Sequence, residues 1–155
     1  MNSINREIVV DAENAVVGRL ASKVAKLLLE GYRVYIVNID KAVITGKRKR
    51  VLEDFTRRLW IKSNVNPRRH GPFKPRSPEG IFRRVVRGML PRRKPRGKSA
   101  YKRLRVYRGV PASLSGRDFI VFDDVLYREN PYGSVTLYEI AKSIGWIPIE
   151  ERVGG

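Results

Sequence analysis

The sequence predicts an α/β fold, and three observations lead to this class. A β-branched run, "EIVVDA" at 7–12, precedes an amphipathic stretch at 14–31 and a second apolar run, "YRVYIVNI" at 32–39. Strand, helix and strand joined by tight links form a βαβ unit with parallel strands and a right-handed crossover. Because more amphipathic stretches follow, we expect a parallel-sheet core with helices on both faces, which carries a basic, proline-rich insertion.

Apolar spacing predicts the helix of this unit. Asn14 is expected to be its N-cap and Gly31 the residue that terminates it. The second strand is apolar almost throughout, which is typical of a strand covered on both faces. The buried face of the helix repeats at intervals of three and four residues and consists of Val17, Leu20, Ala21, Val24, Leu27 and Leu28.

A turn at 44–50 and a short helix are expected next. In this helix Arg57 and Arg58 would face outward. Its apolar side would be formed by Val51, Leu52, Phe55 and Leu59.

Six of the nine prolines then lie between Pro67 and Pro95. We therefore expect stiff cationic loops at 66–76 and 91–98, separated by one helix, "SPEGIFRRVVRGML". Ser77 is a suitable N-cap for this helix, Pro78 suits its first position, and Pro91 would stop it. Arg83, Arg84 and Arg87 would project, and the buried stripe would consist of Ile81, Phe82, Val85, Val86, Met89 and Leu90.

The C-terminal third completes the expected core. Residues 99–109 suggest a short helix leading into a strand, and 118–127 are strand-like but broken by the paired acids Asp123 and Asp124. Residues 133–146 predict a capped amphipathic helix. No repeat or low-complexity tract divides the chain, so one domain is expected over 1–155.

Composition excludes several kinds of chemistry. There is no cysteine, so disulfides, thiolate zinc sites and cysteine nucleophiles are excluded, and one histidine cannot make a histidine-ligated metal site. We expect no metal and no cofactor. No apolar run approaches the roughly 20 residues that span a bilayer, and the N-terminus lacks a secretory signal, so a cytoplasmic protein is expected.

The charge is concentrated in the middle of the chain. The net charge is +18, and residues 47–108 hold 23 basic and three acidic residues. The rest of the chain holds 10 basic and 12 acidic residues and is close to neutral. A field of this strength attracts nucleic acid or an anionic membrane surface before any smaller ligand.

Motifs for nucleotide enzymes are incomplete. The link before the first helix has only Gly18 where a dinucleotide fingerprint needs several glycines, and Lys47 is followed by Arg48 where a phosphate loop needs serine or threonine. Adjacent carboxylates such as Asp123 and Asp124 point in different directions and cannot act on one substrate. We expect no catalytic site and no small-molecule substrate, although a nucleotide-processing enzyme remains a rival hypothesis.

The basic region differs from a disordered tail or a membrane helix. Prolines divide its charge into pieces, which argues against a continuous membrane-surface helix. Arginine outnumbers lysine 22 to 11, which favours RNA, and no helix-turn-helix, zinc finger or basic zipper is present; a chromatin-like DNA protein is the second rival. Interleaved apolar residues indicate that the region packs on something: Trp60, Phe73, Ile81, Phe82, Val85, Met89, Leu90, Tyr101, Leu104 and Tyr107.

Several blocks resemble one protein family. "DAENAVVGRLAS", "VNIDKAVITGKRK" and above all the block from "RHGPFKPRSPEG" through "RGMLPRRKPRG" to "YRGVP" are similar to the L-thirteen family of large-subunit ribosomal proteins, in its archaeal and eukaryotic branch. The resemblance covers about residues 10–146. It implies a three-layer α/β/α fold with a parallel sheet of about four strands, and no enzymatic activity.

The resemblance also implies a function and a site. The protein would be a structural constituent of the large ribosomal subunit that binds and helps to assemble its RNA, next to other ribosomal proteins in the cytoplasm. The RNA-binding region would be about 47–108. The family's RNA-binding positions are carried over to this sequence, and Lys102 and Arg103, which lie beside them, are added. The expected RNA-binding residues are Arg19, Lys47, Arg48, Lys49, Arg50, Arg68, Arg69, His70, Lys74, Arg76, Arg83, Arg84, Arg87, Arg92, Arg93, Lys94, Arg96, Lys98, Lys102 and Arg103.

Overall fold

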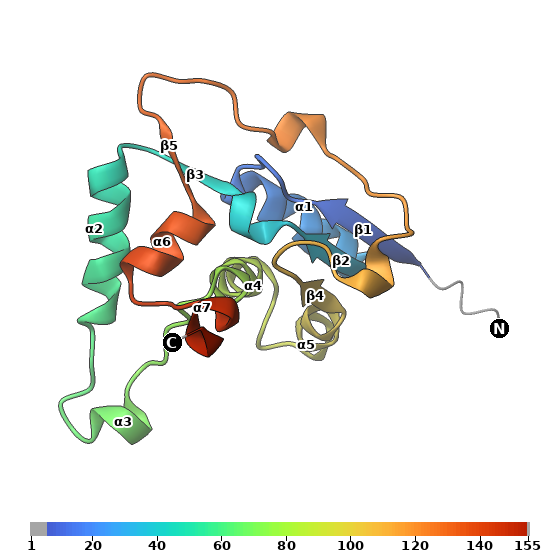
Figure 1. The fold of residues 1–155 in the computed structure, drawn as a ribbon. Helices are drawn as coiled ribbons and strands as arrows, with labels where there is room; N and C mark the ends of the chain where they lie inside the picture. Colours follow the sequence, from blue (N-terminus) through green and yellow to red (C-terminus); the bar gives the residue numbers. More distant parts are fainter. Residues whose placement is uncertain (1–5, 155) are drawn as a thin grey trace.

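A computed structural model describes residues 6–154, which contain seven α-helices and five strands (Figure 1). Three 3-10 turns, Ile39–Lys41, Ala112–Leu114 and Asp123–Val125, lie between them. The helices and strands in chain order are β1 (Glu7–Asp11), α1 (Val17–Leu29), β2 (Arg33–Val37), β3 (Val43–Thr45), α2 (Arg48–Leu59), α3 (Pro67–His70), α4 (Pro78–Met89), α5 (Pro95–Lys102), β4 (Leu104–Val106), β5 (Ser134–Thr136), α6 (Leu137–Ser143) and α7 (Ile149–Val153).

The main sheet is parallel, with the strand order β1-β2-β4. The predicted βαβ unit is confirmed, because β1 and β2 pair in parallel and α1 connects them. The sheet has three strands instead of about four. The strand-like run at 118–127 is broken at its paired acids, as expected: Ile120 makes a single parallel bridge to Val10, and the 3-10 turn Asp123–Val125 ends the extended run.

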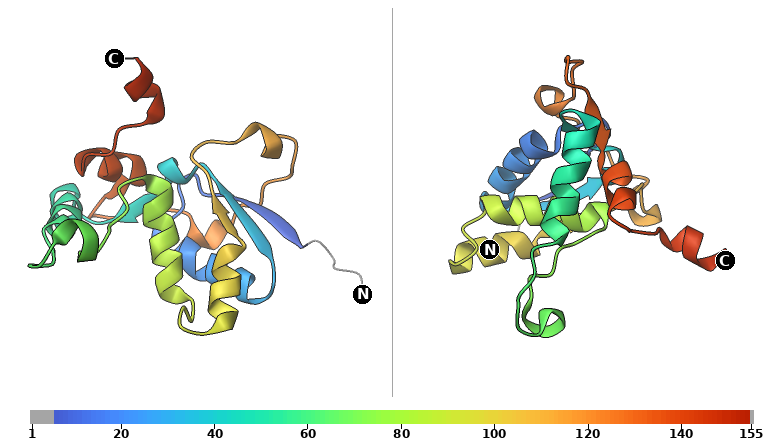
Figure 2. Two further views of the ribbon diagram at one scale, coloured as in Figure 1. Left: turned by 90° about the horizontal axis from the view of Figure 1, so that it is seen from below. Right: turned by 90° about the vertical axis from the view of Figure 1, so that its left-hand side faces the viewer.

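The two faces of the sheet are covered differently. Helices α1, α4 and α5 lie on one face, and the segment with the 3-10 turn Ala112–Leu114 lies on the other (Figure 2, left). On that second face Val9 and Val37 pack with Leu114, flanked by Tyr35 and Tyr107. This small cluster occupies the place of the second helical layer, so the sheet is not enclosed between two helical layers as expected.

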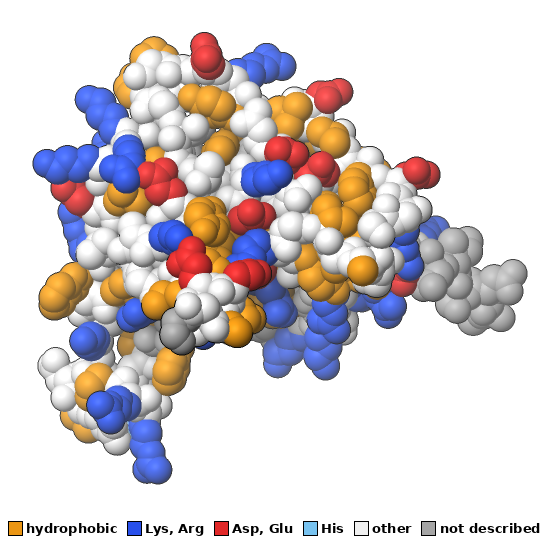
Figure 3. Space-filling model, in the orientation of Figure 1, with side chains coloured by type: hydrophobic (Ala, Val, Ile, Leu, Met, Phe, Trp, Pro, Cys, Tyr) orange, Lys and Arg blue, Asp and Glu red, His pale blue; other side chains and the backbone are white. Residues whose placement is uncertain are grey.

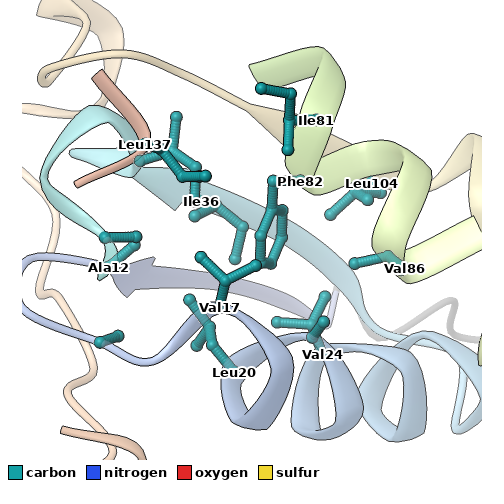
Figure 4. Close-up of a cluster of buried hydrophobic side chains, with 14 of the residues drawn as sticks. Ala12, Val17, Leu20, Val24, Ile36, Ile81, Phe82, Val86, Leu104 and Leu137 are labelled. Carbon is teal, nitrogen blue, oxygen red and sulfur yellow. The ribbon is translucent and has the colours of Figure 1, made fainter. Parts of the chain in front are cut away.

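The main core lies between the sheet and its helices. Phe82 of α4 is fully buried and points towards α1 and β2, where Val24 and Ile36 surround it (Figure 4). Because adjacent strand residues face opposite sides, Ile36 joins this core while Tyr35 joins the second face. Truncating a buried phenylalanine of this kind costs about 3–5 kcal/mol of stability, so Phe82 fixes α4 in place.

The expected start of α1 is wrong, and its expected end is confirmed. The helix begins at Val17 and not after Asn14, which has a left-handed backbone with φ of 57° and donates its N–H to the Lys41 carbonyl, 3.2 Å away. Gly31 does terminate the helix. Its φ is 98°, and its N–H donates to the Leu28 carbonyl, which satisfies an open group at the helix end.

The region between β3 and β4 contains more helix than expected. α2 and α4 are confirmed, and the Ser77 hydroxyl caps α4 by accepting the Gly80 N–H at 3.2 Å. The segments 66–76 and 91–98, expected as loops, contain α3 and the start of α5, because Pro67 and Pro95 sit in the first turns of these helices. Met89 was expected in the core but is 44% exposed.

The expected helix at 133–146 is a strand followed by a helix. β5 pairs antiparallel with β3, a strand that lies partly in the turn expected at 44–50. Helix α6 begins after Thr136, whose hydroxyl accepts the Glu139 N–H at 3.2 Å. The β3-β5 ribbon places α6 against α2 and α4 and completes the core.

Candidate nucleic-acid interface

Lys and Arg side chains are unevenly distributed over the surface. In Figure 3 they project along the left edge beside α2, around α3 and from the lower margin below α5, while most Asp and Glu side chains of this face lie towards its middle and upper right. Eight ion pairs join described residues, and of the basic side chains in region 47–108 only Arg48, Lys49 and Arg108 take part. From Arg50 to Arg105, no basic side chain reaches a carboxylate of residues 6–154. These cations repel one another, and the field that they create attracts anions.

The first basic cluster, Lys47–Arg50, opens α2. All four side chains are exposed, Arg48 contacts Glu139 of α6, and Lys49 lies 3.9 Å from Glu53. The first turn of α2 contains no acid, although the positive end of the helix dipole disfavours cations there. Such a placement weakens the helix and suits a site for anions.

A groove of about 750 Å³ adjoins this cluster. Lys47 lines it from the N-cap of α2, Arg50 and Arg58 line it from α2 itself, and Gly18 lines it from the first turn of α1. Arg19, the next residue of that turn, is exposed. The structure therefore places Arg19 and the start of α2 at neighbouring helix ends, beside one groove.

The segment 60–76, here called the arm, carries the second basic cluster. The arm extends away from the end of α2 and bears α3 at its tip (Figures 1 and 2). Arg68, Arg69 and His70 form most of α3 and are exposed, and Arg76 is exposed near the base. The tip of the arm therefore presents positive charge clear of the core.

Two hydrogen bonds fasten the base of the arm. The Lys74 ammonium donates to the Arg58 carbonyl near the end of α2, where a cation is favourable. The Arg84 guanidinium of α4 donates to the Phe73 carbonyl at 2.7 Å. Lys74 and Arg84 thus have structural contacts, yet Arg84 remains exposed at the surface.

Two aromatic side chains of the arm are exposed. Trp60 is 75% and Phe73 is 74% exposed, whereas the sequence suggested that both pack on the protein. Neither ring packs on the protein, because the arm that connects Trp60 and Phe73 extends away from the core. Exposed aromatic rings among cations are typical of surfaces that stack unpaired bases and bind phosphates.

The three arginines of α4 do not project equally. Arg83 is half-buried, with its guanidinium over the Tyr101 ring of α5 at 5.1 Å, and its Nε is a buried donor without a hydrogen-bond acceptor in the described part of the chain. Arg87 is also half-buried, and Arg84 is exposed. Arg83 therefore holds α4 against α5 in addition to adding charge.

The third basic cluster lies in α5 and the turn before it. The Lys94 N–H closes this turn on the Pro91 carbonyl at 2.9 Å. Arg103, which follows α5, donates to the Leu28 carbonyl at the end of α1 and is half-buried. The exposed members of the cluster are Arg92, Arg93, Lys94, Arg96, Lys98 and Lys102.

Some exposed residues of the interface were missing from the expected set. Arg57, Arg58, Lys62 and Arg105 lie in the same region and are exposed. The charge run itself could have identified them. Arg57, Arg58 and Lys62 lie outside the family blocks, and Arg105 lies inside the block that ends in "YRGVP" but was left out. No sequence pattern marks Trp60 and Phe73 as interface residues, because their exposure depends on the course of the arm.

The shifted pKa values lie outside these clusters. A hydrogen bond from Arg117 is the main cause that lowers the pKa of Glu7, and Arg33 and Tyr35 add to it. Lys23 lowers the pKa of Asp124 through a hydrogen bond. Glu151 raises the pKa of Lys142 in the same way. These pairs stabilise the near-neutral part of the protein.

Within residues 6–154, no group of three or more His, Asp or Glu side chains could hold a metal ion. No helix in this part is long and apolar enough to cross a membrane.

Comparison with known proteins identifies the family. The family model described as "Ribosomal protein L13" matches residues 5–113. "Large ribosomal subunit protein uL13" of Sulfolobus acidocaldarius is 41% identical over 94% of this chain and 97% of its own length. The proteins of the same name from Archaeoglobus fulgidus (45% identity, 89% of this chain and 87% of its own) and Methanococcus maripaludis (49%, 70% and 79%) are also similar. All three relatives are archaeal, as the resemblance implied, and the chain belongs to the ribosomal protein L13 family.

Proposed function

We propose that this protein is a structural constituent of the large ribosomal subunit, not an enzyme, and that it binds and helps to assemble large-subunit rRNA. One observation carries the RNA-binding part: from Arg50 to Arg105 the basic side chains lack acidic partners among the described residues. The names of its relatives support the ribosomal part. Its partners would be this RNA and neighbouring ribosomal proteins of the cytoplasmic ribosome, without a membrane or a small-molecule substrate.

We further propose that residues 1–155 act as one domain, with the basic, proline-rich insertion at about 47–108 as its RNA-binding part. The α/β core holds three basic clusters on separate elements: the start of α2, the arm, and α5 with the turn before it. Each cluster would neutralise phosphates of a different RNA segment. Arginine suits this role because its planar group grips phosphate with two hydrogen bonds.

The salt dependence of RNA binding tests this mechanism. If about ten phosphates are neutralised, the slope of log K against log salt concentration lies near −7 to −9. Replacing Arg92, Arg93 and Lys94 by glutamine should make the slope shallower by about two to three. The control Arg128→Gln with Arg152→Gln, both exposed and outside the clusters, should leave it unchanged. A wild-type slope near −2 would rule out an extended RNA surface.

Three measurements separate this function from its rivals. Co-migration with the large subunit on a density gradient at high salt is expected, and free sedimentation would contradict the proposal. A chromatin-like protein would bind duplex DNA and folded RNA equally at matched salt, whereas we expect a preference for folded RNA. Saturable nucleotide binding near Gly18 in equilibrium dialysis would instead favour a nucleotide enzyme.

A further inference from the structure

A pocket of about 360 Å³ lies between α2, the base of the arm and α4. Its size falls in the range of about 300–1,000 Å³ that is usual for small-ligand sites. Its apolar wall consists of Phe55, Leu59, Ile81, Val85 and Ile144. Three cationic side chains line it as well: Arg58, Lys74 and Arg84.

Contacts within the protein hold these three cations in place. The Arg58 guanidinium lies 5.0 Å from the centre of the Phe55 ring, which is part of the wall. Lys74 and Arg84 donate to the carbonyls of Arg58 and Phe73. The pocket therefore combines an apolar interior with positive charge that is already positioned.

Gly88 also lines the pocket, from the last turn of α4. Glycine is among the least favourable residues inside a helix. Its backbone needs no glycine here, because Gly88 is not among the residues with positive φ. A Cβ at this position would meet no atom within 4 Å. Neither conformation nor packing within the described chain requires glycine, but any side chain would occupy space beside the pocket.

The charge indicates what kind of ligand fits. An apolar protein side chain would suit the wall, but it would supply no negative charge to the three cations around it. A nucleotide of RNA supplies both parts, since its base is flat and largely apolar and its phosphates are anionic. Bases of loops and bulges are free to leave the stack.

We propose that this pocket receives one unstacked RNA base, with Arg58, Lys74 and Arg84 bound to the phosphates beside it. The inference rests on the proposed function and adds to it a preference for an unpaired nucleotide over a duplex. Gly88 then has a physical role: it leaves room for the base.

Abasic substitution tests the proposal, because it removes a base and keeps the phosphate charge. The probe is the large-subunit rRNA fragment that full-length protein retains at high salt, with each unpaired nucleotide made abasic in turn. At one position we expect wild-type affinity to fall about tenfold, the scale of losing one base contact. In Gly88→Leu that loss should nearly disappear.

Two further variants control for folding. Gly88→Ala should raise the melting temperature, because alanine favours the helix, and should still reduce the base-dependent tenfold preference. Ser22→Ala, an exposed position in α1, should keep the preference in full. A weaker preference in a more stable protein cannot result from unfolding.

The outcomes separate this inference from the proposed function. If no rRNA fragment is retained, the proposed function fails. Suppose that fragments are retained, but that no abasic position lowers the affinity of the wild type while leaving that of Gly88→Leu unchanged. The pocket then does not bind a base. If Gly88→Leu instead abolishes a crosslink to a neighbouring ribosomal protein and leaves every abasic effect unchanged, the occupant is protein and the inference is overturned.

Discussion

At the scale of single residues, Gly97 shows how a basic segment can depend on tight packing. It is buried in the first turn of α5, and a Cβ there would lie 2.1 Å from the Pro91 carbonyl oxygen and 3.0 Å from Pro91 Cγ. Pro91 stops α4. Because Gly97 has no side chain, the first turn of α5 can pack directly against Pro91. The exposed cations between them are therefore held in a closed turn.

We expect Gly97→Ala to destabilise the protein by about 1–3 kcal/mol, the usual cost of a forced contact in a packed site. Urea unfolding followed by circular dichroism measures the change. Gly116→Ala is the matched control, because a Cβ there meets nothing within 4 Å and its φ is not positive. Its effect should stay within about 0.5 kcal/mol. Equal losses in both variants would contradict the steric explanation.

Three glycines interrupt the basic stretches, Gly71, Gly88 and Gly97, and each could allow the main chain to approach a phosphate. From the sequence, turn or capping roles explain Gly71 and Gly97 equally well, whereas Gly88 lies inside a predicted helix, where glycine is unfavourable. The structure gives Gly71 and Gly97 a different reason, because a Cβ would clash with the carbonyls of Pro67 and Pro91. Those contacts form only after the chain has bent, so no local pattern reveals them.

At the scale of elements, one carboxylate joins three segments at the edge of the sheet. Glu7 of β1 contacts Arg33 of β2 at 3.3 Å and Arg117 of the following long connection at 2.8 Å. Tyr35 of β2 also donates its hydroxyl to Glu7, at 3.4 Å. The first strand is thereby tied both to its neighbour and to the segment beyond Leu114.

Acid should weaken this tie. Because the pKa of Glu7 is lowered in the folded protein, its contribution to stability is present above its ordinary value of 4.5 and is lost as the pH falls through the lowered value. Glu7→Gln should therefore melt below the wild type at about pH 7, and the difference should shrink towards about pH 3. The melting temperature measured across this range tests the expectation.

Glu129→Gln serves as the control for this experiment. Glu129 is exposed and forms no ion pair with another described residue. Its melting temperature should follow that of the wild type at every pH. A constant difference between Glu7→Gln and the wild type from neutral to acid pH would show that charge on Glu7 does not matter.

Elements with local signals were predictable, and elements that depend on distant partners were not. Ser77, Pro78 and Pro91 mark both ends of α4 within the segment itself, so its bounds follow from the sequence. From the sequence, Val135 could lie on the buried face of a helix or in a strand. It lies in a strand because it pairs with Ile44 of β3. The strand-like run around Ile120 stays at the sheet edge, where a single bridge holds it.

At the scale of the whole molecule, two regions of opposite electrostatic character share one core. The near-neutral part contributes the internal ion pairs of Glu7, Glu13, Asp124 and Glu151. The basic region contributes the cations without acidic partners. The sequence predicted this region from charge alone, but not that Arg83 and Arg103 also pack within the fold, nor that three elements enclose a pocket.

Salt should stabilise the free protein, because screening weakens repulsion among the unpaired cations more than it weakens the fewer ion pairs. We expect the melting temperature to rise between about 0.05 and 0.5 M NaCl, over which the screening length falls below about 10 Å. The variant with Arg92, Arg93 and Lys94 replaced by glutamine should show a smaller rise. A melting temperature that falls with salt in the wild type would show that the ion pairs dominate.

The position of β4 in the sheet also sets an order in time. β4 pairs directly with β2, yet the whole basic region from Lys47 to Arg103 is synthesised between them. On the ribosome the N-terminal strands emerge first, so the sheet lacks its third strand until every cation of that region has left the exit tunnel. Folding is slow when residues that must make contact are so far apart in the sequence. The newly made protein therefore offers its full positive charge to RNA before its own core has closed.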